Sequence, residues 1–386
     1  MVVMGTRPEV IKLAPVIKSL KKDPFFDVSV CATAQHRHML DQMMGVFELK
    51  ADVDFDLMTD GQDLTDINCR VLQAWRDYFK HSKPDLIIVQ GDTTTAFATA
   101  TAAFYHHIPV AHVEAGLRTG NIYSPWPEEM NRRLTGAITQ FHFAPTELSR
   151  DHLLKENISS SNIWVTGNTV IDALLSIVEK INHDEVLQAK LKNSFEAIDF
   201  SKRVLLVTGH RRENFGEGFE NICRALHDLS FEENVEIVYP MHLNPNVRQP
   251  VNSILGGRDN IHLIEPLDYV SFVFLMMHCH LVLTDSGGVQ EEMPSLGKPV
   301  IVMRDTTERP EAITAGTAVL AGTSSENILR LAKTLLNDEK VYQRMSQAKN
   351  PFGDGHASDR ISEILKRYYE KEVSAGSFMG HESQRI

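Results

Sequence analysis

The feature that most constrains the fold of this chain is a regular alternation of short apolar runs with longer helical patterns. Each apolar run ends in Gly, Asp, Thr or Ser before the helical pattern begins. Such runs are typical of parallel strands buried on both faces, with helices in the connections. The alternation predicts doubly wound α/β sheets with strands at VVM, VSVCAT, LIIVQ, VAHVE, FHFAP and IWVTG, then VLLVTG, VEIVYP, IHLIE, LVLTDS, PVIVM and TAVLAG.

The runs fall into two halves of similar size. Because 386 residues exceed what one hydrophobic core usually serves, we expect two Rossmann-like domains that face each other across a cleft. The first would span residues 1–168 and carry acid/base residues, and the second would span 169–357. A last helix within 358–386 is expected to pack back on the first domain.

Charge and composition narrow the classes of partner. The chain has 39 basic and 51 acidic residues, a formal net charge of −12, which argues against a nucleic-acid or membrane-surface binder. The four cysteines form no CxxC pair, so we expect buried free thiols of a reducing compartment. The longest apolar run, 272–283, is too short to span a bilayer, and Arg7 and Pro8 come too early for a signal peptide. These observations predict a cytoplasmic protein.

Polar motifs follow the predicted strands of the first half. In GTRPE, Gly5 permits a tight turn, and Arg7 with Lys12 would face an anion near a helix amino terminus. The plain alternative is an ordinary turn with a solvated arginine. In VQGDTTTA, Asp92 follows a strand directly, where an acid/base role and a helix-capping role are equally favoured.

Two further acidic segments follow in the same half. Glu114 ends a buried strand, where a carboxylate is costly unless it is paired or used. The segment SPWPEEMNRR then brings Glu128 and Glu129 next to two arginines. A salt-bridged helix start is the plain interpretation of this segment, and for Glu129 we favour it.

The second half carries basic and glycine-rich strand ends. His210 lies among arginines in TGHRREN, which favours a phosphate or acid/base role over a structural one. Small side chains and free amides follow another strand in TDSGGVQEE, as a pyrophosphate requires, with Glu292 one helical turn later to reach ribose hydroxyls. Arg309 would face the same rim. His242 is a cleft or regulatory candidate, with a structural role equally possible.

Fingerprints of common cofactors are missing. No GxGxxG follows the first strand and no GKS/T loop occurs, which argues against nicotinamide cofactors and ATP P-loops. The histidine pairs and scattered cysteines lack metal-ligand spacing, so we expect neither a metal nor a cofactor.

Taken in order, these motifs resemble the non-hydrolysing UDP-N-acetylglucosamine 2-epimerase family. The resemblance covers nearly the whole chain and rests on GTRPE, TAQHR, GDTTT, HVEAGLRT, SPWPEEMNR, TGNTVID, TGHRREN, HLNPNVR, TDSGGVQEE and TTERPE. It implies a GT-B-like fold, a homodimer, and interconversion of UDP-N-acetylglucosamine and UDP-N-acetylmannosamine for cell-surface polysaccharide, with UDP as a further ligand. One departure is the short first strand, since family members usually have a longer one before GTRPE.

The resemblance also assigns residues. It implies a catalytic group of Asp92, Glu114, Glu128 and His210. It implies a nucleotide-sugar site of Arg7, Lys12, Phe272, Ser286, Gly287, Gly288, Glu292 and Arg309. Some members are activated by substrate at a second site, for which Gln35, Arg70 and His242 are the candidates here.

Three alternatives stay open at this point. A GT-B glycosyltransferase would share the SGG…E segment but would need an acceptor, and a hydrolysing epimerase would release free N-acetylmannosamine. A sugar-nucleotide sensor without catalysis would gain nothing from clustered carboxylates. For an epimerase without a nicotinamide, we expect elimination and re-addition of UDP, which requires at least two acid/base groups.

Overall fold

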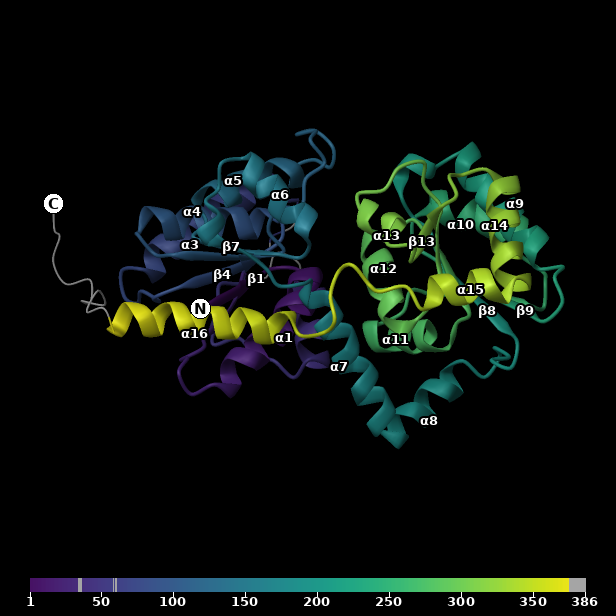
Figure 1. Ribbon diagram of the computed structural model, residues 1–386, viewed down its shortest axis with the longest axis horizontal. Helices are drawn as coiled ribbons and strands as arrows, with labels where there is room; N and C mark the ends of the chain where they lie inside the picture. The colour runs from purple at the N-terminus through teal and green to yellow at the C-terminus, as the bar shows by residue number, and fades with distance from the viewer. Residues whose placement is uncertain (34–36, 58, 60, 375–386) are drawn as a thin grey trace. The chain divides into compact units, whose positions relative to one another are not determined.

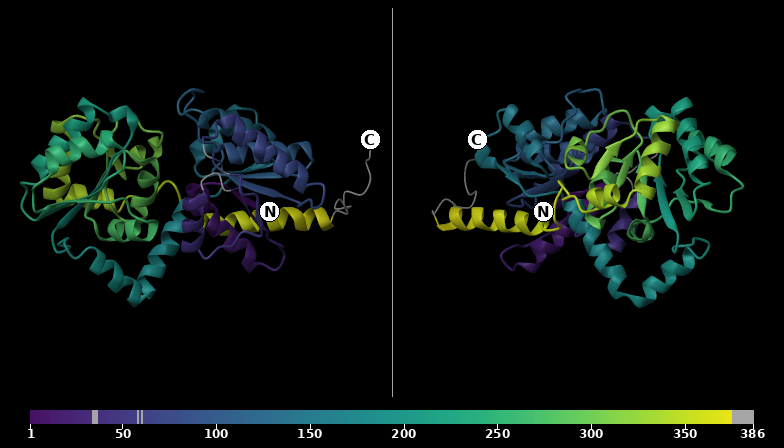
Figure 2. Two further views of the ribbon diagram at one scale, coloured as in Figure 1. Left: turned by 180° about the vertical axis from the view of Figure 1, so that it is seen from behind. Right: turned by 45° about the vertical axis from the view of Figure 1, so that its right-hand side comes forward.

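The computed structural model describes residues 1–33, 37–57, 59 and 61–374. The chain divides into two compact units, which we call unit 1 (Met1–Ala173 with the segment from Gly353) and unit 2 (Leu174–Phe352). Each unit is built on a parallel sheet with helices on both faces (Figures 1 and 2). The doubly wound α/β class predicted from the sequence is therefore confirmed for both.

The sheet of unit 1 has seven strands in the order β3-β2-β1-β4-β5-β6-β7. Its central strands are buried runs of apolar residues, as the sequence predicts. The two-residue edge strand β3 was not predicted, because it forms no apolar run. The strands are β1 (Val2–Met4), β2 (Val30–Ala32), β3 (Val53–Asp54), β4 (Ile87–Gln90), β5 (Val110–Val113), β6 (Phe141–Ala144) and β7 (Ile163–Val165).

Helices cover both faces of this sheet. One face carries α3, α4 and α5, and the other carries α1 and α16 (Figure 1). The helices of unit 1 are α1 (Arg7–Lys22), α2 (Arg37–Val46), α3 (Leu64–Tyr78), α4 (Thr94–Tyr105), α5 (Glu128–Ile138), α6 (Glu147–Lys155) and α16 (Ala357–Ser374), with α7 (Thr169–His183) beginning in this unit.

The carboxyl-terminal helix α16 belongs to unit 1 although unit 2 separates it from the rest in sequence. Its first turn is capped by the buried carboxylate of Asp172, which accepts from the Ser358 backbone N–H at 2.7 Å. Further along, Lys366 Nζ donates to Asp23 at 2.8 Å, and Tyr368 packs edge-on against Phe141. Contacts along the whole helix thus join it to the face that carries α1.

The sheet of unit 2 has six strands in the order β10-β9-β8-β11-β12-β13. The strands are β8 (Arg203–Thr208), β9 (Val235–Pro240), β10 (Ile261–Ile264), β11 (Leu281–Thr284), β12 (Val300–Val302) and β13 (Ala318–Leu320). The helices are α8 (Glu185–Ser194), α9 (Glu217–Leu229), α10 (Pro245–Leu255), α11 (Tyr269–His278), α12 (Gly287–Glu292), α13 (Pro310–Thr314), α14 (Ser325–Asn337) and α15 (Glu339–Ser346).

Both sheets reverse their winding direction beside the first strand of the unit. The reversal lies between β1 and β4 in unit 1, and between β8 and β11 in unit 2. Ligands of open parallel sheets bind beyond the carboxyl ends of the strands at such switch points. The loops that leave these four strands carry GTRPE, GDTTT, TGHRREN and TDSGG.

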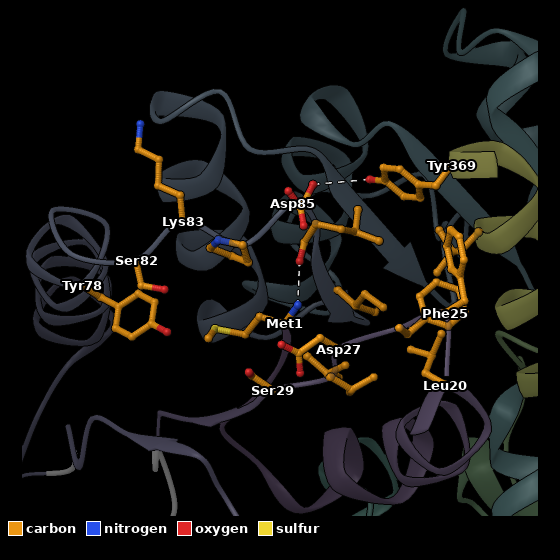
Figure 3. A pocket seen from close by; sticks show the side chains of 17 residues that line it. Met1, Leu20, Phe25, Asp27, Ser29, Tyr78, Ser82, Lys83, Asp85 and Tyr369 are labelled. Atoms are coloured by element: carbon orange, nitrogen blue, oxygen red, sulfur yellow. Dashed lines mark hydrogen bonds between the residues drawn. The ribbon is translucent and has the colours of Figure 1, made fainter. Parts of the chain in front are cut away.

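A cavity of about 470 Å³ lies at the amino-terminal ends of the strands in unit 1, where β1 and β4 begin (Figure 3). Aromatic side chains of Phe25, Tyr78 and Tyr369 line it together with Asp27 and Asp85. Because the candidate residues follow the carboxyl ends of the strands, this cavity is separate from the candidate site.

The cysteines and the apolar helices bear on two predictions made from the sequence. All four cysteines are free thiols, but Cys69 is exposed on α3, so the prediction that all four are buried was wrong for this residue. Within the described part of the chain, no helix is both long enough and apolar enough to cross a membrane.

Candidate active site

Glu114 occupies an unusual backbone position at the switch point of unit 1. It follows β5 and has a backbone φ of 64°. Residues other than glycine adopt this left-handed conformation only at a cost in free energy. Its side chain is nearly buried, and Oε2 accepts from Lys12 Nζ at 2.5 Å and from the Gln90 amide. Oε1 accepts from Asn168 Nδ2 at 3.3 Å. The structure thus combines a strained backbone at Glu114 with a carboxylate held in place from three sides, as expected for a functional group.

Asp92 lies in the loop after β4 and pairs with an arginine that the sequence did not single out. Arg132 Nη2 donates to Asp92 Oδ2 at 2.6 Å, and Asn131 donates to the Asp92 main-chain oxygen at 2.9 Å. Burial raises the pKa of Asp92, and the nearby Glu114 carboxylate adds to this, against the opposing effect of Arg132 and Lys12. Asp92 is therefore a carboxyl group with a greater tendency to hold a proton than an ordinary aspartate.

Glu128 and Glu129, the first residues of α5, differ in their surroundings. Glu129 is fully buried and accepts from the Thr119 and Gly120 backbone N–H groups at 3.0 and 3.2 Å. Glu129 also forms ion pairs with Arg132 and Arg133 at 3.5 and 3.3 Å, so the salt-bridged helix start favoured for this residue is confirmed. Glu128 Oε2 is buried and has no hydrogen-bond partner among the described residues. A buried carboxylate oxygen without a protein partner is a candidate for contact with a polar group of a substrate.

The GTRPE and GDTTT loops are joined to each other by a buried carboxylate. Glu9 accepts from the Gly5 and Thr6 backbone N–H groups at 2.9 and 2.7 Å and from Thr93 Oγ1 at 2.7 Å. A Cβ atom on Gly5 would lie 2.6 Å from Thr95 Oγ1 of the GDTTT segment and 2.4 Å from Thr33 Oγ1 after β2, so this close approach requires glycine. These contacts fix the start of α1, where Arg7 lies half-buried and from which Lys12 reaches Glu114.

The switch point of unit 2 brings His210 and Asp285 together. Asp285 is completely buried and accepts from the backbone N–H groups of His210 and Arg211, each at 2.8 Å. The pKa of His210 is lowered, mainly by burial and also by the positive charges of His242 and Arg211. Asp285 opposes this effect and raises the pKa. The rings of His210 and His242 are stacked with centroids 5.4 Å apart. His210 and His242 thus lie side by side in unit 2.

The TDSGG segment forms the predicted turn before a helix. Ser286 precedes α12, and the Arg309 guanidinium lies 3.6 Å from where a Cβ on Gly287 would be. Arg309 also forms a buried ion pair with Glu291. On the same helix, Glu292 accepts from the Tyr269 hydroxyl at 2.8 Å, and Tyr269 and Phe272 both lie on α11. An arginine and small residues therefore surround the amide groups at the start of α12.

The structure adds residues that sequence reasoning missed. Arg132, Asn168 and Gln90 contact the two carboxylates of unit 1, and Tyr269 contacts Glu292 in unit 2. No local pattern indicated these contacts, because each joins loops and helices distant in sequence. The described residues include no group of three or more His, Cys, Asp or Glu side chains arranged to hold a metal ion.

The three candidates for a regulatory site do not lie in one part of the chain. His242 stacks on His210, as described above. Arg70 lies on α3 in unit 1, where its guanidinium contacts the Thr59 hydroxyl. Gln35 lies outside the described residues.

Two doubly wound units with acidic groups at one switch point and a glycine turn with an arginine at the other define the GT-B-like class of nucleotide-sugar proteins. A sequence profile described as UDP-N-acetylglucosamine 2-epimerase matches residues 18–366. The chain belongs to this family, which confirms the family predicted from its motifs.

Curated relatives support the same assignment. The UDP-N-acetylglucosamine 2-epimerase of Escherichia coli O157:H7 is 57% identical over 365 residues, covering 94% of this chain and 97% of the relative. The Bacillus subtilis (strain 168) protein of the same name is 52% identical over 382 residues, covering 98% of each.

Solved structures show the same fold. The Neisseria meningitidis UDP-GlcNAc 2-epimerase bound to UDP-GlcNAc matches with a TM-score of 0.88 and 50% identity, over 95% of this chain and 99% of that one. The S. aureus MnaA–UDP complex matches with a TM-score of 0.84 and 42% identity, over 96% of each chain.

Proposed function

We propose that this chain is a non-hydrolysing UDP-N-acetylglucosamine 2-epimerase that interconverts UDP-N-acetylglucosamine and UDP-N-acetylmannosamine. The observation that carries the proposal is the pair of differently held carboxylates at the switch point of unit 1. Inversion of carbon 2 requires one group to take a proton and another to return one. The relatives that share nearly the whole chain are named for this activity.

The chemistry is an elimination followed by re-addition. A base takes the carbon 2 proton, the C–H electrons form a carbon 1–carbon 2 double bond, and the bond from carbon 1 to the UDP oxygen breaks. UDP then adds back to carbon 1 while carbon 2 receives a proton on the opposite face. Reactants and product have the same oxidation state, so no redox partner is consumed.

We assign the proton-accepting role to Glu114 and the proton-donating role to Asp92. The Lys12 ammonium at 2.5 Å favours the ionised form of Glu114, as a base requires. The raised pKa of Asp92 favours a protonated carboxyl group, as an acid requires. Glu128, with its unsatisfied buried oxygen, is the third member of the group and is available to bind a sugar hydroxyl or amide.

We assign the nucleotide to unit 2. The amides of Gly287 and Gly288 would bind the diphosphate together with Arg309, and Glu292 would bind the ribose. The Ser286 N–H, predicted to be free, instead donates to Thr284 Oγ1 at 2.9 Å, so Ser286 would contribute its small side chain. Tyr269 holds Glu292 in place through its hydroxyl, and Phe272 lies on the same helix. His210 would serve the departing phosphate, while Arg7 and Lys12 add positive charge from unit 1.

Turnover in heavy water tests the proposal. The protein is incubated with UDP-N-acetylglucosamine alone, and products are identified by proton NMR and mass spectrometry. We expect UDP-N-acetylmannosamine carrying deuterium at carbon 2, because the proton passes through side chains that exchange with solvent. Product that retains the original hydrogen would contradict the elimination, and accumulation of free N-acetylmannosamine with UDP would identify a hydrolysing enzyme.

We further propose a homodimer formed through the outer faces of α4 and α5. Four apolar side chains are exposed there, Phe104 and Tyr105 on α4, and Met130 and Leu134 on α5. The two helices are neighbours, so exposed apolar side chains lie on adjacent helices, and exposed apolar groups that gather in this way mark interfaces. Leu134→Glu should convert a dimer into a monomer in sedimentation analysis, whereas a monomeric parent protein would reject the proposal.

We also propose a cytoplasmic location, supported by three buried free thiols, and a role in cell-surface polysaccharide synthesis, supported by family resemblance. A second, activating substrate site would use Gln35, Arg70 and His242. Sigmoidal rate dependence on UDP-N-acetylglucosamine that becomes hyperbolic in Arg70→Ala would support it, and hyperbolic kinetics in the parent protein would count against it.

A further inference from the structure

The two oxygens of Asp285 have different surroundings. Oδ2 accepts the backbone N–H groups of His210 and Arg211 at 2.8 Å each, and Asn214 Nδ2 at 3.4 Å. These bonds hold the loop after β8 against the end of β11. One oxygen of the carboxylate is therefore sufficient to explain the structural contribution of Asp285.

The other oxygen has no such explanation. Oδ1 is buried and has no hydrogen-bond partner among the described residues. Burying an unsatisfied carboxylate oxygen is unfavourable, and such atoms in folded proteins commonly serve a function. An ionisable group lies close to it: Nδ1 of His210 is 3.7 Å from Oδ1.

This distance is an ion-pair separation slightly longer than a hydrogen bond. The His210 side chain is 45% exposed, whereas the Asp285 side chain is fully buried, so the ring lies between Asp285 and solvent. Contacts of this type are often long in ligand-free proteins and shorten when substrate binds. The other charged or titratable groups at the His210 ring are His242, stacked on it, and Arg211 beside it. Both oppose a positive charge on His210, so Asp285 supplies the favourable interaction.

We propose that Asp285 is a positioning residue for His210: it accepts a hydrogen bond from Nδ1–H, fixes the tautomer that leaves Nε2 for the substrate, and stabilises the imidazolium. A carboxylate behind an imidazole performs these functions in other enzymes. The inference extends the proposed function, because it assigns to His210 one reacting nitrogen. It uses a residue that the motifs indicated only as the end of a strand.

Nitrogen-15 NMR of histidine-labelled protein tests this directly, with His210→Gln to assign the signal. In the unaltered protein above the pKa of His210, we expect Nδ1 protonated and Nε2 unprotonated. The opposite tautomer would overturn the inference. This result does not depend on activity, so an inactive protein would reject the proposed function and leave the inference to be decided by the spectrum.

Asp285→Asn provides the second test. Its amide oxygen can still accept the two backbone N–H groups, while its NH₂ group faces Nδ1 and favours the other tautomer. We expect the tautomer to reverse, the pKa of His210 to fall, and turnover to drop by up to about 10,000-fold, the loss that the equivalent replacement causes in a Ser-His-Asp triad. Asn214→Ala is the matched control, because it removes a bond to Oδ2 and leaves Oδ1 unchanged. The control should retain the tautomer of the parent protein.

A double-mutant cycle separates positioning from a general structural role. If Asp285 acts through His210, then Asp285→Asn should change turnover less than about threefold when His210 is already Gln. Independent losses that multiply would overturn the inference. Should Asp285→Asn fail to fold, the tautomer of the unaltered protein still decides the question.

Discussion

Replacing Glu114 by Gln tests the central assignment with little change in shape. The amide retains the side-chain length and the backbone conformation, but it removes the negative charge that Lys12 faces at 2.5 Å. If Glu114 takes the carbon 2 proton, turnover should fall by about 100-fold or more, which corresponds to at least about 2.7 kcal/mol in the activation barrier.

The same change should also cost stability. The side chains of Lys12 and Glu114 are only 17% and 6% exposed, so salt screens their attraction weakly. Loss of one charge-assisted hydrogen bond there should lower the free energy of unfolding by about 1.5–3 kcal/mol, measured by urea denaturation. The affinity for UDP, measured by calorimetry, should change much less than turnover, because all of the proposed nucleotide residues except Arg7 and Lys12 belong to unit 2.

Glu156→Gln is the matched control for this experiment. It removes another carboxylate of unit 1, which pairs with Arg118 at 2.7 Å and has no proposed role in the reaction. The control should lose stability but keep its turnover. A folded Glu114→Gln protein with turnover within about threefold of the parent protein would refute the assignment of Glu114 as base.

Three further predictions concern other parts of the molecule. Glu292→Ala should weaken UDP binding by about 1–3 kcal/mol in calorimetry, because it removes hydrogen bonds between a charged group and the ribose; unchanged affinity would reject that contact. Gly5→Ala should lower the free energy of unfolding by about 1–3 kcal/mol, since its Cβ would lie 2.4 Å from Thr33 Oγ1, whereas Gly45→Ala on α2, with nothing within 4 Å, should not destabilise; equal effects would contradict the steric argument. Burial lowers the pKa of His142 from 6.5 to about 3. Between these two pH values the imidazole is protonated in the unfolded chain and neutral in the folded one. The free energy of unfolding should therefore fall by up to about 1.4 kcal/mol per pH unit as the pH drops through this range. Urea denaturation of His142→Phe should show a weaker pH dependence, and an identical dependence would contradict the burial of a neutral imidazole.

The sequence was sufficient for the fold wherever a strand is long and apolar. Runs such as LIIVQ and VLLVTG lie in buried central strands, and their polar ends lie at the switch points. The edge strand β3 was missed because two residues, one of them an exposed aspartate, carry no such pattern. The exposure of Cys69 was missed because spacing alone does not show which face of α3 a residue occupies.

The candidate site was predictable as a set of loops, but its pairings were not. The position of Glu114 after a buried strand indicated a paired or functional carboxylate, and the structure supplies Lys12 as the partner. Arg132 was expected in a local salt bridge with its helix neighbours, yet it also reaches Asp92, which is distant in sequence. Such contacts depend on how helices pack across the sheet, and a single sequence does not encode them as a local pattern.

The return of α16 to unit 1 has a consequence for the order of synthesis. A ribosome releases every strand of unit 1 first and then the whole of unit 2, and only afterwards the helix that Asp172 caps. Until then, Phe141 lacks its contact with Tyr368, and Asp23 lacks Lys366. A released chain that ends just before Ala357 should therefore contain a folded unit 2 and an unfinished unit 1, whose uncovered apolar surface should bind chaperones.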